Sequence, residues 1–309
     1  MNELRDRVRA EIGKVVVGQD DTVDLMLAAI VLGGHVLLEG VPGVAKSLLA
    51  NAFARTVDGS YRRVQFTPDM LPSDLTGTMA LRGGELRFRQ GPVFANVLLA
   101  DEINRTPPKT QSALLEAMQE RQVSVDGVAH RLPEPFLVVA TQNPIEYEGT
   151  YPLPEAQLDR FLVQADVGYP DAQQELAVLA LARHGVASPS LEHVDVVLDA
   201  GTVAAARDRV DATTVSSEVA EYVVALVRGT RALPSVTLGA SPRAAVHLLA
   251  AAKARARLAG REVVIPDDVA AMALPVLRHR LVLTPEAELE RFGTADAVAA
   301  ALSAVPVPR

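Results

Sequence analysis

The sequence predicts an α/β protein in which a doubly wound parallel sheet is followed by a second, all-helical domain. Five short apolar runs alternate with helical spacing between residues 18 and 168. Several of these runs are apolar at consecutive positions, which is typical of central strands in a parallel sheet covered on both faces. Beyond about Pro170 only helical patterns remain. Together these three observations favour a sheet domain first and a helical domain second.

The elements are expected in the following order. An amphipathic helix comes first, because Leu4, Val8 and Ile12 recur at four-residue spacing. The five predicted strands cover residues 35–40, 62–66, 96–101, 135–141 and 160–167. Helical patterns at 47–57 and 110–121 lie between them. This alternation predicts a five-stranded parallel sheet flanked by helices.

Two stretches interrupt the alternation and are predicted to be hairpin insertions. The first, near 75–94, has Gly83-Gly84 between two strand-like pieces. The second, near 121–132, has Asp126-Gly127 between alternating apolar residues, which is a strong signal for a two-residue hairpin turn. Four helical patterns follow at 171–185, 216–233, 242–260 and 267–281. We therefore expect an α/β domain over residues 1–169 and a helical domain over residues 170–309.

The composition argues against several classes of protein. There is no cysteine, and the six histidines show no metal-ligand spacing, so neither a disulfide framework nor a thiolate metal site is expected. A formal net charge of −8 argues against a nucleic-acid binder that depends on many phosphate contacts. The charged N-terminus does not resemble a signal peptide, and no apolar run is long enough to span a bilayer. We expect a cytoplasmic protein, with His35 as a satisfied edge residue.

The stretch "LLEGVPGVAKSLL", residues 37–49, resembles a phosphate-binding loop with one substitution. In the pattern Gly-x-x-x-x-Gly-Lys-Ser/Thr, Gly40, Lys46 and Ser47 are in place, and Ala45 stands at the last glycine. Because the loop follows a predicted strand and opens a helix, backbone N–H groups would point at the phosphates. Ala45 adds only a methyl group, which a helix-entry position tolerates if the ligand does not press on its Cβ.

The loop predicts the ligands ATP and Mg²⁺. Lys46 would reach the β- and γ-phosphates, and Ser47 would ligate the metal ion. The residues expected to contact the nucleotide here are Gly40, Pro42, Gly43, Val44, Ala45, Lys46, Ser47 and Leu48. The alternative is an ordinary turn between a strand and a helix.

Polar residues end two further predicted strands. Asp101 and Glu102 follow the run "VLLA", and buried carboxylates are costly there unless they meet a cation or a water to activate. Asp101 would hold the Mg²⁺ shell, and Glu102 would polarise the attacking water. Asn143, in "ATQNP", would hold that water and sense the γ-phosphate. The alternatives are a solvated acidic pair for the first two and a simple Asn-Pro turn for the third.

These three pieces, in this order, resemble the Walker A, Walker B and sensor 1 motifs of the AAA+ ATPases. The stretches "EGVPGVAKS", "ADEINRTPPKTQSALLEAMQE", "EGTYPLPEAQLDRF" and "GASPRA" resemble the MoxR branch of that family, which carries alanine at this position of the loop. The two hairpins correspond to the helix-2 insert and the pre-sensor-1 hairpin of the clade. The resemblance implies a P-loop AAA+ core with a C-terminal helical lid.

The resemblance also assigns roles outside these motifs. Arg160 matches the arginine finger, which acts on the ATP of a neighbouring subunit, and Arg243 matches sensor 2. From the residues alone, Arg160 could instead pair with Asp159 or Glu155, and Arg243 could be an exposed first-turn arginine. The segment "VVVGQDD" resembles the adenine-proximal turn, which places Val17 and Gly18 near the base. Arg105 is expected either to pair across a subunit boundary or to make a local contact.

The function that the resemblance implies is that of an ATP-hydrolysing subunit in a homo-oligomeric, hexameric ring with magnesium as cofactor. It would act as a chaperone-like remodeller of a protein client, with a von Willebrand A-domain partner, in metal-centre insertion or complex maturation. Three alternatives stay open: a metal-chelatase motor subunit, a nucleic-acid motor and a nucleotide-gated scaffold. The acidic balance argues against the nucleic-acid motor, and the intact Glu102 argues against the scaffold.

Overall fold

The computed structural model describes residues 1–143, 149–181 and 191–308. The contacts divide the chain into two compact units. The α/β unit comprises Leu4–Leu153 and Ala165–Val203, and the helical unit comprises Met1–Glu3, Pro154–Gln164 and Ala204–Arg309. These ranges differ from the expected domains 1–169 and 170–309, because 154–164 group with the helical unit and 165–203 with the sheet. A domain boundary at residue 169 stays a prediction.

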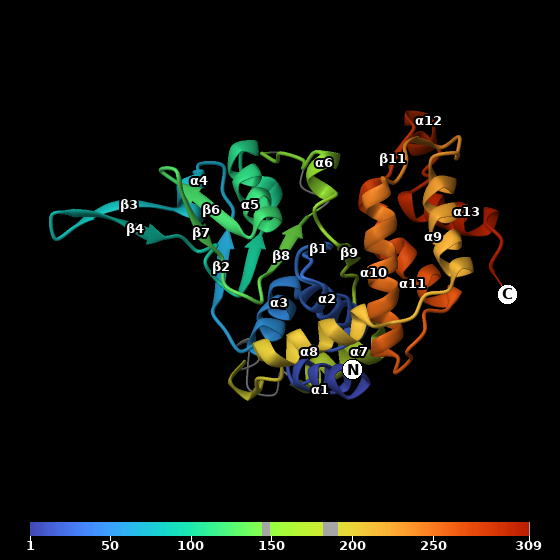
Figure 1. Ribbon diagram of the computed structural model, residues 1–309, viewed down its shortest axis with the longest axis horizontal. Coiled ribbons are helices and arrows are strands. Elements are labelled where there is room, and N and C mark those ends of the chain that lie inside the picture. The colour runs from blue at the N-terminus through green and yellow to red at the C-terminus, as the bar shows by residue number, and fades with distance from the viewer. Residues whose placement is uncertain (144–148, 182–190, 309) are drawn as a thin grey trace. The chain divides into compact units, whose positions relative to one another are not determined.

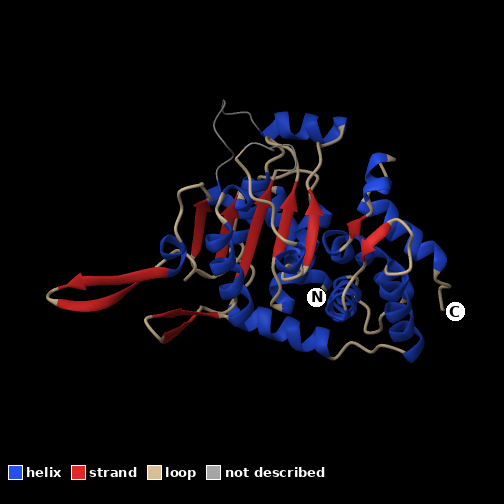
Figure 2. Cartoon of the chain, turned by 90° about the horizontal axis from the view of Figure 1, so that it is seen from above, coloured by secondary structure: helices blue, strands red, loops and turns tan. Residues whose placement is uncertain are grey.

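The α/β unit is built on a five-stranded sheet, whose strands are the red arrows at the centre of Figure 2. The strand order is β2-β5-β8-β1-β9. The pairs β2–β5, β5–β8 and β1–β8 are parallel. The strands are β1 (Val36–Glu39), β2 (Tyr61–Gln65), β5 (Val97–Asp101), β8 (Leu137–Gln142) and β9 (Val163–Asp166). Every residue of β5 is buried, as is nearly all of β8, so the continuous apolar runs correctly predicted central strands.

Helices accompany the strands along the chain in the alternation that the sequence predicts (Figure 1). They are α1 (Asn2–Gly13), α2 (Asp20–Leu32), α3 (Lys46–Arg55), α4 (Pro72–Thr76), α5 (Pro108–Glu120), α7 (Ala172–Leu181) and α8 (Ala200–Asp211), with the 3-10 helices η1 (Ile103–Arg105) and η2 (Leu191–His193). The helices α2, α4 and α8 have no counterpart among the predicted elements, and α8 spans the boundary between the two units. The rest of the helical pattern predicted to end at residue 185 lies outside the described residues.

Two antiparallel hairpins interrupt this order near the predicted positions. One pairs β3 (Gly77–Arg82) with β4 (Glu85–Gln90) and extends well away from the sheet in Figures 1 and 2. The other pairs β6 (Gln122–Val125) with β7 (Val128–Arg131) around the predicted Asp126-Gly127 turn. Both turn residues have positive φ, 48° and 80°, which explains the choice of Asp-Gly.

His35 precedes β1 and is buried, with 3% of its surface exposed. Its Nε2 lies 3.2 Å from the carbonyl oxygen of Met118 on α5, and its Nδ1 accepts a hydrogen bond of 3.0 Å from the Val138 N–H on β8. Both ring nitrogens are therefore satisfied, as expected. Its place is not an edge, however, because β1 lies between β8 and β9.

The helical unit contains four longer helices whose apolar faces pack together. Its elements are α6 (Glu155–Leu158), α9 (Ser217–Thr230), β10 (Val236–Leu238), α10 (Pro242–Leu258), α11 (Pro266–Leu277), η3 (Arg278–Arg280), β11 (Val282–Leu283), α12 (Pro285–Leu289) and α13 (Thr294–Ala304). The sequence predicts only helices here, and the structure adds one short antiparallel pair, β10 with β11. Strands of three and two residues are too short to give a period-two pattern.

Among the described residues, no helix combines the length and the apolar character that a membrane crossing requires.

Candidate functional site

A cavity of about 420 Å³ in the α/β unit brings together residues from four separate stretches of the sequence. It is lined by Pro42, Gly43, Val44, Ala45, Lys46, Ser47, Leu48, Arg63, Gln65, Asp101, Glu102, Thr141, Gln142 and Asn143. The strands β1, β5 and β8 are parallel neighbours, so the residues that follow them lie at one edge of the sheet. Ligands of open α/β sheets bind at this carboxyl edge.

The loop between β1 and α3 forms one wall of the cavity. Gly40 begins the loop where the backbone passes very close to Val167, since a Cβ at this position would lie 2.3 Å from the Val167 carbonyl oxygen. Ala45, the residue before α3, has a left-handed backbone with φ 63°. The usual glycine at this position is therefore explained by backbone conformation. Ala45 therefore carries conformational strain, a cost that is separate from the contact between ligand and Cβ considered from the sequence.

The start of α3 suits an anionic ligand. Its N-cap residue, Ala45, has no polar side-chain group that could cap the first turn, which leaves the N-terminal N–H groups of the helix to a ligand. Lys46 Nζ donates hydrogen bonds to the carbonyl oxygens of Gly40 and Val41, the latter at 3.1 Å. The lysine charge is thus held inside the loop, where phosphate oxygens would meet it.

Asp101 lies at the centre of a buried polar network, and 7% of its side chain is exposed. Its carboxylate accepts hydrogen bonds from Ser47 Oγ at 2.9 Å, Thr141 Oγ1 at 2.6 Å and Arg63 Nη2 at 2.7 Å. Ser47 and Asp101 thus offer two adjacent hard oxygen ligands, which fit Mg²⁺. Within the described ranges, no group of three or more His, Cys, Asp or Glu residues could hold a metal ion.

Glu102 follows β5 in a left-handed backbone conformation with φ 58°. Its Oε2 accepts a hydrogen bond of 2.6 Å from Gln65 Nε2 and lies 3.1 Å from Arg105 Nε. Its N–H donates to Thr141 Oγ1 at 2.9 Å. The carboxylate therefore faces the cavity while two side chains restrain it. Arg105 makes the local contact that was one of its two expected roles.

The end of β8 supplies amide groups to the same cavity. Asn143 lies just beyond the last residue of the strand and is buried, with 5% of its surface exposed. The neighbouring Gln142 Oε1 is buried without a hydrogen-bond partner in the described part of the chain. An unsatisfied buried oxygen in the wall of a cavity is explained by a polar ligand or an ordered water.

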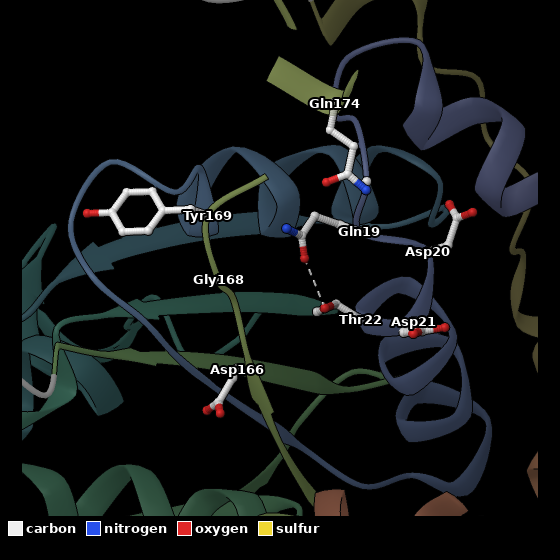
Figure 3. Close-up of a pocket in the computed structure, with 9 residues that line it drawn as sticks. Gln19, Asp20, Asp21, Thr22, Asp166, Gly168, Tyr169 and Gln174 are labelled. Atoms are coloured by element: carbon white, nitrogen blue, oxygen red, sulfur yellow. Dashed lines mark hydrogen bonds between the residues drawn. The ribbon is translucent and has the colours of Figure 1, made fainter. Parts of the chain in front are cut away.

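A second cavity, of about 390 Å³, lies where "VVVGQDD" enters α2 (Figure 3). It is lined by Gly18, Gln19, Asp20, Asp21, Thr22, Asp166, Gly168, Tyr169 and Gln174. Gly18 lines it as expected for a residue near the base, whereas Val17 does not. Gly18 has a left-handed backbone with φ 75°, which favours glycine, and a Cβ there would also displace the end of the Gln174 side chain. Gly168 follows Val167, which touches Gly40, so this cavity adjoins the start of the loop.

The two arginines expected to act on the nucleotide belong to the helical unit and do not line either cavity. Arg160 follows α6, and no hydrogen bond or ion pair joins its guanidinium to the described residues. Its alternative as an ion-pair partner of Asp159 or Glu155 therefore has no support among the recorded contacts. Arg243 lies in the first turn of α10, half exposed, with Nη1 3.8 Å from Asp159 Oδ2. Their roles stay predictions, as do those of the cavity residues.

The sequence reasoning missed Arg63, Gln65, Thr141 and Gln142. Arg63 and Gln65 occupy alternate positions of β2, and Gln65 lies directly opposite Asp101 in the register. A polar residue at every second position of the strand "RRVQF" was the available signal. It could be used only with the strand order, which places β2 beside β5.

Comparisons with known proteins agree with this geometry. Residues 35–163 match the family described as "ATPase family associated with various cellular activities (AAA)", and residues 228–301 match the AAA lid domain. The uncharacterised protein YeaC of Bacillus subtilis is 46% identical over 310 residues, covering 100% of this chain and 96% of the relative. Chaperone MoxR1 of Mycobacterium tuberculosis is 45% identical, with coverage of 98% and 82%.

Two further similarities extend over nearly the whole chain. Protein MoxR of Methylorubrum extorquens is 37% identical, covering 98% of this chain and 94% of the relative. A crystal structure of a candidate ATPase from Cytophaga hutchinsonii superimposes with a TM-score of 0.90 at 41% identity, covering 99% and 96% of the two chains.

Proposed function

The chain belongs to the MoxR family of AAA+ ATPases, and from this premise we propose that it hydrolyses Mg-ATP to remodel a protein client. The observation that carries the proposal is the single cavity that joins the loop Pro42–Leu48 with Asp101, Glu102 and Asn143. A phosphate cradle, a magnesium ligand and a carboxylate base are the parts that phosphoryl transfer to water needs.

Each residue of this site would have a distinct role in hydrolysis. Ser47 and Asp101 would hold Mg²⁺, which when bound neutralises charge on the phosphates. Lys46 would turn from the loop carbonyls to the phosphate oxygens. Glu102 would accept a proton from the attacking water once Gln65 and Arg105 release it, and Asn143 would orient that water. The cavity at Gly18 would take the adenine base.

Arg160 and Arg243 would complete the site. Arg160 is proposed as a finger that enters the nucleotide site of a neighbouring subunit. An arginine supplied in trans is worth about 10³–10⁵ in rate, so hydrolysis would depend on assembly of a ring. Arg243 is proposed to approach the γ-phosphate of its own subunit's nucleotide. A hexamer is the expected ring.

The client and the partner are proposals that rest on family membership. One relative is named a chaperone, which supports remodelling of proteins as the use of the hydrolysis energy. We propose a von Willebrand A-domain protein as partner, and metal-centre insertion or complex maturation as the setting. The net charge of −8 supports a protein client over a nucleic acid.

The test uses Glu102→Gln with Glu116→Gln, an exposed carboxylate on α5, as the matched control. Glu102→Gln should keep ATP affinity and release phosphate about 10²–10⁴ times more slowly, because it lacks the general base. The control should match the wild type. Wild-type turnover by Glu102→Gln would contradict the assigned base.

The client is tested in cell extract with the same variant. Immobilised Glu102→Gln with ATP should retain proteins that Lys46→Ala does not retain, since only the former would stay in the nucleotide-bound state. Identical retention by the two variants would contradict nucleotide-dependent client binding.

A further inference from the structure

Arg280, in η3 of the helical unit, is a buried arginine whose contacts converge on one short turn. Only 2% of its side chain is exposed. Its guanidinium makes six recorded hydrogen bonds. The acceptors are the Asp159 carboxylate, the carbonyl oxygens of Asp159, Phe161, Leu162 and Val276, and His247 Nδ1. Four of the six acceptors therefore belong to the turn 159–162, which carries Arg160.

The strongest of these contacts fix both the charge and the backbone of the turn. Arg280 Nε lies 2.7 Å from Asp159 Oδ1, and its Nη2 lies 2.6 Å from the Phe161 carbonyl oxygen. The neighbouring His279 places its Nε2 3.2 Å from the same carbonyl oxygen. A planar guanidinium presents its donors in a fixed fork, so it can hold a turn in one geometry in a way that a lysine cannot.

These contacts attach the turn to the helical unit. Residues Pro154–Gln164 group with Ala204–Arg309 and not with the sheet residues on either side of them in the sequence. Arg160 is therefore carried by the helical unit, although it lies between β8 and β9 in the chain.

Asp159 is shared between two arginines. Its Oδ1 pairs with Arg280 at 2.7 Å, and its Oδ2 lies 3.8 Å from Arg243 Nη1. A buried cation is costly without a counter-charge, so Arg280 holds Asp159 firmly, whereas the half-exposed Arg243 is held weakly. Arg243, which is expected to contact the subunit's own nucleotide, thus interacts with the carboxylate of Asp159. Asp159 belongs to the turn 159–162, whose Arg160 is expected to act on the nucleotide of the neighbouring subunit.

We propose that Arg280 is a positioning residue for Arg160: with Asp159 as its counter-ion, it clamps the turn 159–162 to the helical unit and so sets where the finger stands in the neighbouring site. This inference rests on the proposed function, because it needs Arg160 to act in trans. It adds that movement of the helical unit in one subunit displaces the finger that this subunit offers to the next.

The test compares Arg280→Lys and Asp159→Asn with the wild type. Both should bind ATP with unchanged affinity, since neither touches the nucleotide cavity, while kcat falls by about 10²-fold, the effect of displacing a positioned group by about 1 Å. The two variants disrupt the same ion pair from opposite sides. If one of them does not fold, the other still tests the inference. The matched control is Asp268→Asn, which removes a buried carboxylate of the same unit that pairs with Arg255 at 2.6 Å and does not contact the turn. It should lower thermal stability and leave kcat near the wild-type value.

Subunit mixing separates a displaced finger from a damaged fold. Glu102→Gln subunits have an inactive site but offer an intact finger. Adding them to Arg280→Lys or Asp159→Asn subunits should raise phosphate release per variant subunit by at least tenfold, because neither substitution changes a residue that lines the nucleotide cavity. A merely structural role predicts no rise.

Arg160→Ala is mixed in parallel. If Arg160→Ala is rescued and the Arg280 and Asp159 variants are not, the inference is overturned while the trans finger stands. If Arg160→Ala is not rescued either, the trans finger of the proposed function fails. Wild-type kcat in Arg280→Lys or Asp159→Asn alone would also overturn the inference.

Discussion

Lowering the pH from 7 to 5 is expected to destabilise the α/β unit through His35. Burial, with a smaller contribution from the nearby Arg121, lowers the pKa of this imidazole from 6.5 to about 3. The neutral ring uses both nitrogens, since Nδ1 accepts from the Val138 N–H and Nε2 faces the Met118 carbonyl oxygen. A second ring proton would have to break the bond to Val138.

The size of the effect follows from the shift. A base with a lower pKa in the folded state binds fewer protons when folded, so its contribution to stability is complete above pH 6.5 and is lost between pH 6.5 and about 3. The loss is about 1.4 kcal/mol per pH unit, which gives about 2 kcal/mol between pH 6.5 and 5. In the helical unit, burial also lowers the pKa of His247, to about 4, and that of His279, so these residues act in the same direction.

The assay is hydrogen exchange of a peptide spanning β8 at pH 7 and pH 5, corrected for the intrinsic pH dependence of exchange. The free energy of opening should fall by about 2 kcal/mol more in the wild type than in His35→Gln, which cannot gain the proton. His193→Gln, at an exposed histidine, is the control and should behave as the wild type. Equal losses in the wild type and His35→Gln would refute the reasoning.

Two further substitutions test the local energetics of the candidate site. Arg63→Ala should lower the free energy of unfolding by about 1 kcal/mol, and with it the thermal midpoint, because Asp101 loses a half-exposed cation at 2.7 Å. Added Mg²⁺ should restore part of this loss. A Mg²⁺ response no larger than that of the wild type would count against a metal site at Asp101. Ala45→Gly should relieve the left-handed strain and stabilise the protein by up to about 1 kcal/mol in thermal unfolding, whereas destabilisation would show that φ 63° is not strained here.

Much of the fold could be predicted from local patterns. The apolar runs that became β5 and β8 identify central strands because both faces of the sheet are covered, so no alternation is needed. The hairpin at Asp126-Gly127 was predictable for a similar reason, since two adjacent positive φ angles restrict the residue types.

The candidate site was predicted only where its residues follow strands. Lys46, Asp101 and Asn143 each come after an apolar run, so the shared edge of a parallel sheet brings them to one cavity. Arg63 and Arg280 could not be found in this way. Their partner carboxylates, Asp101 and Asp159, lie 38 and 121 residues away in the sequence, and only the folded chain brings them together.

The central claim is that a magnesium-bound triphosphate lies at the start of α3. Isothermal titration of ATP into the folded wild type and Lys46→Ala, in a buffer containing Mg²⁺, tests it most directly. The account predicts a saturable heat with one site per subunit for the wild type and none for Lys46→Ala. Absence of heat with folded wild-type protein, or equal affinity in Lys46→Ala, would contradict it.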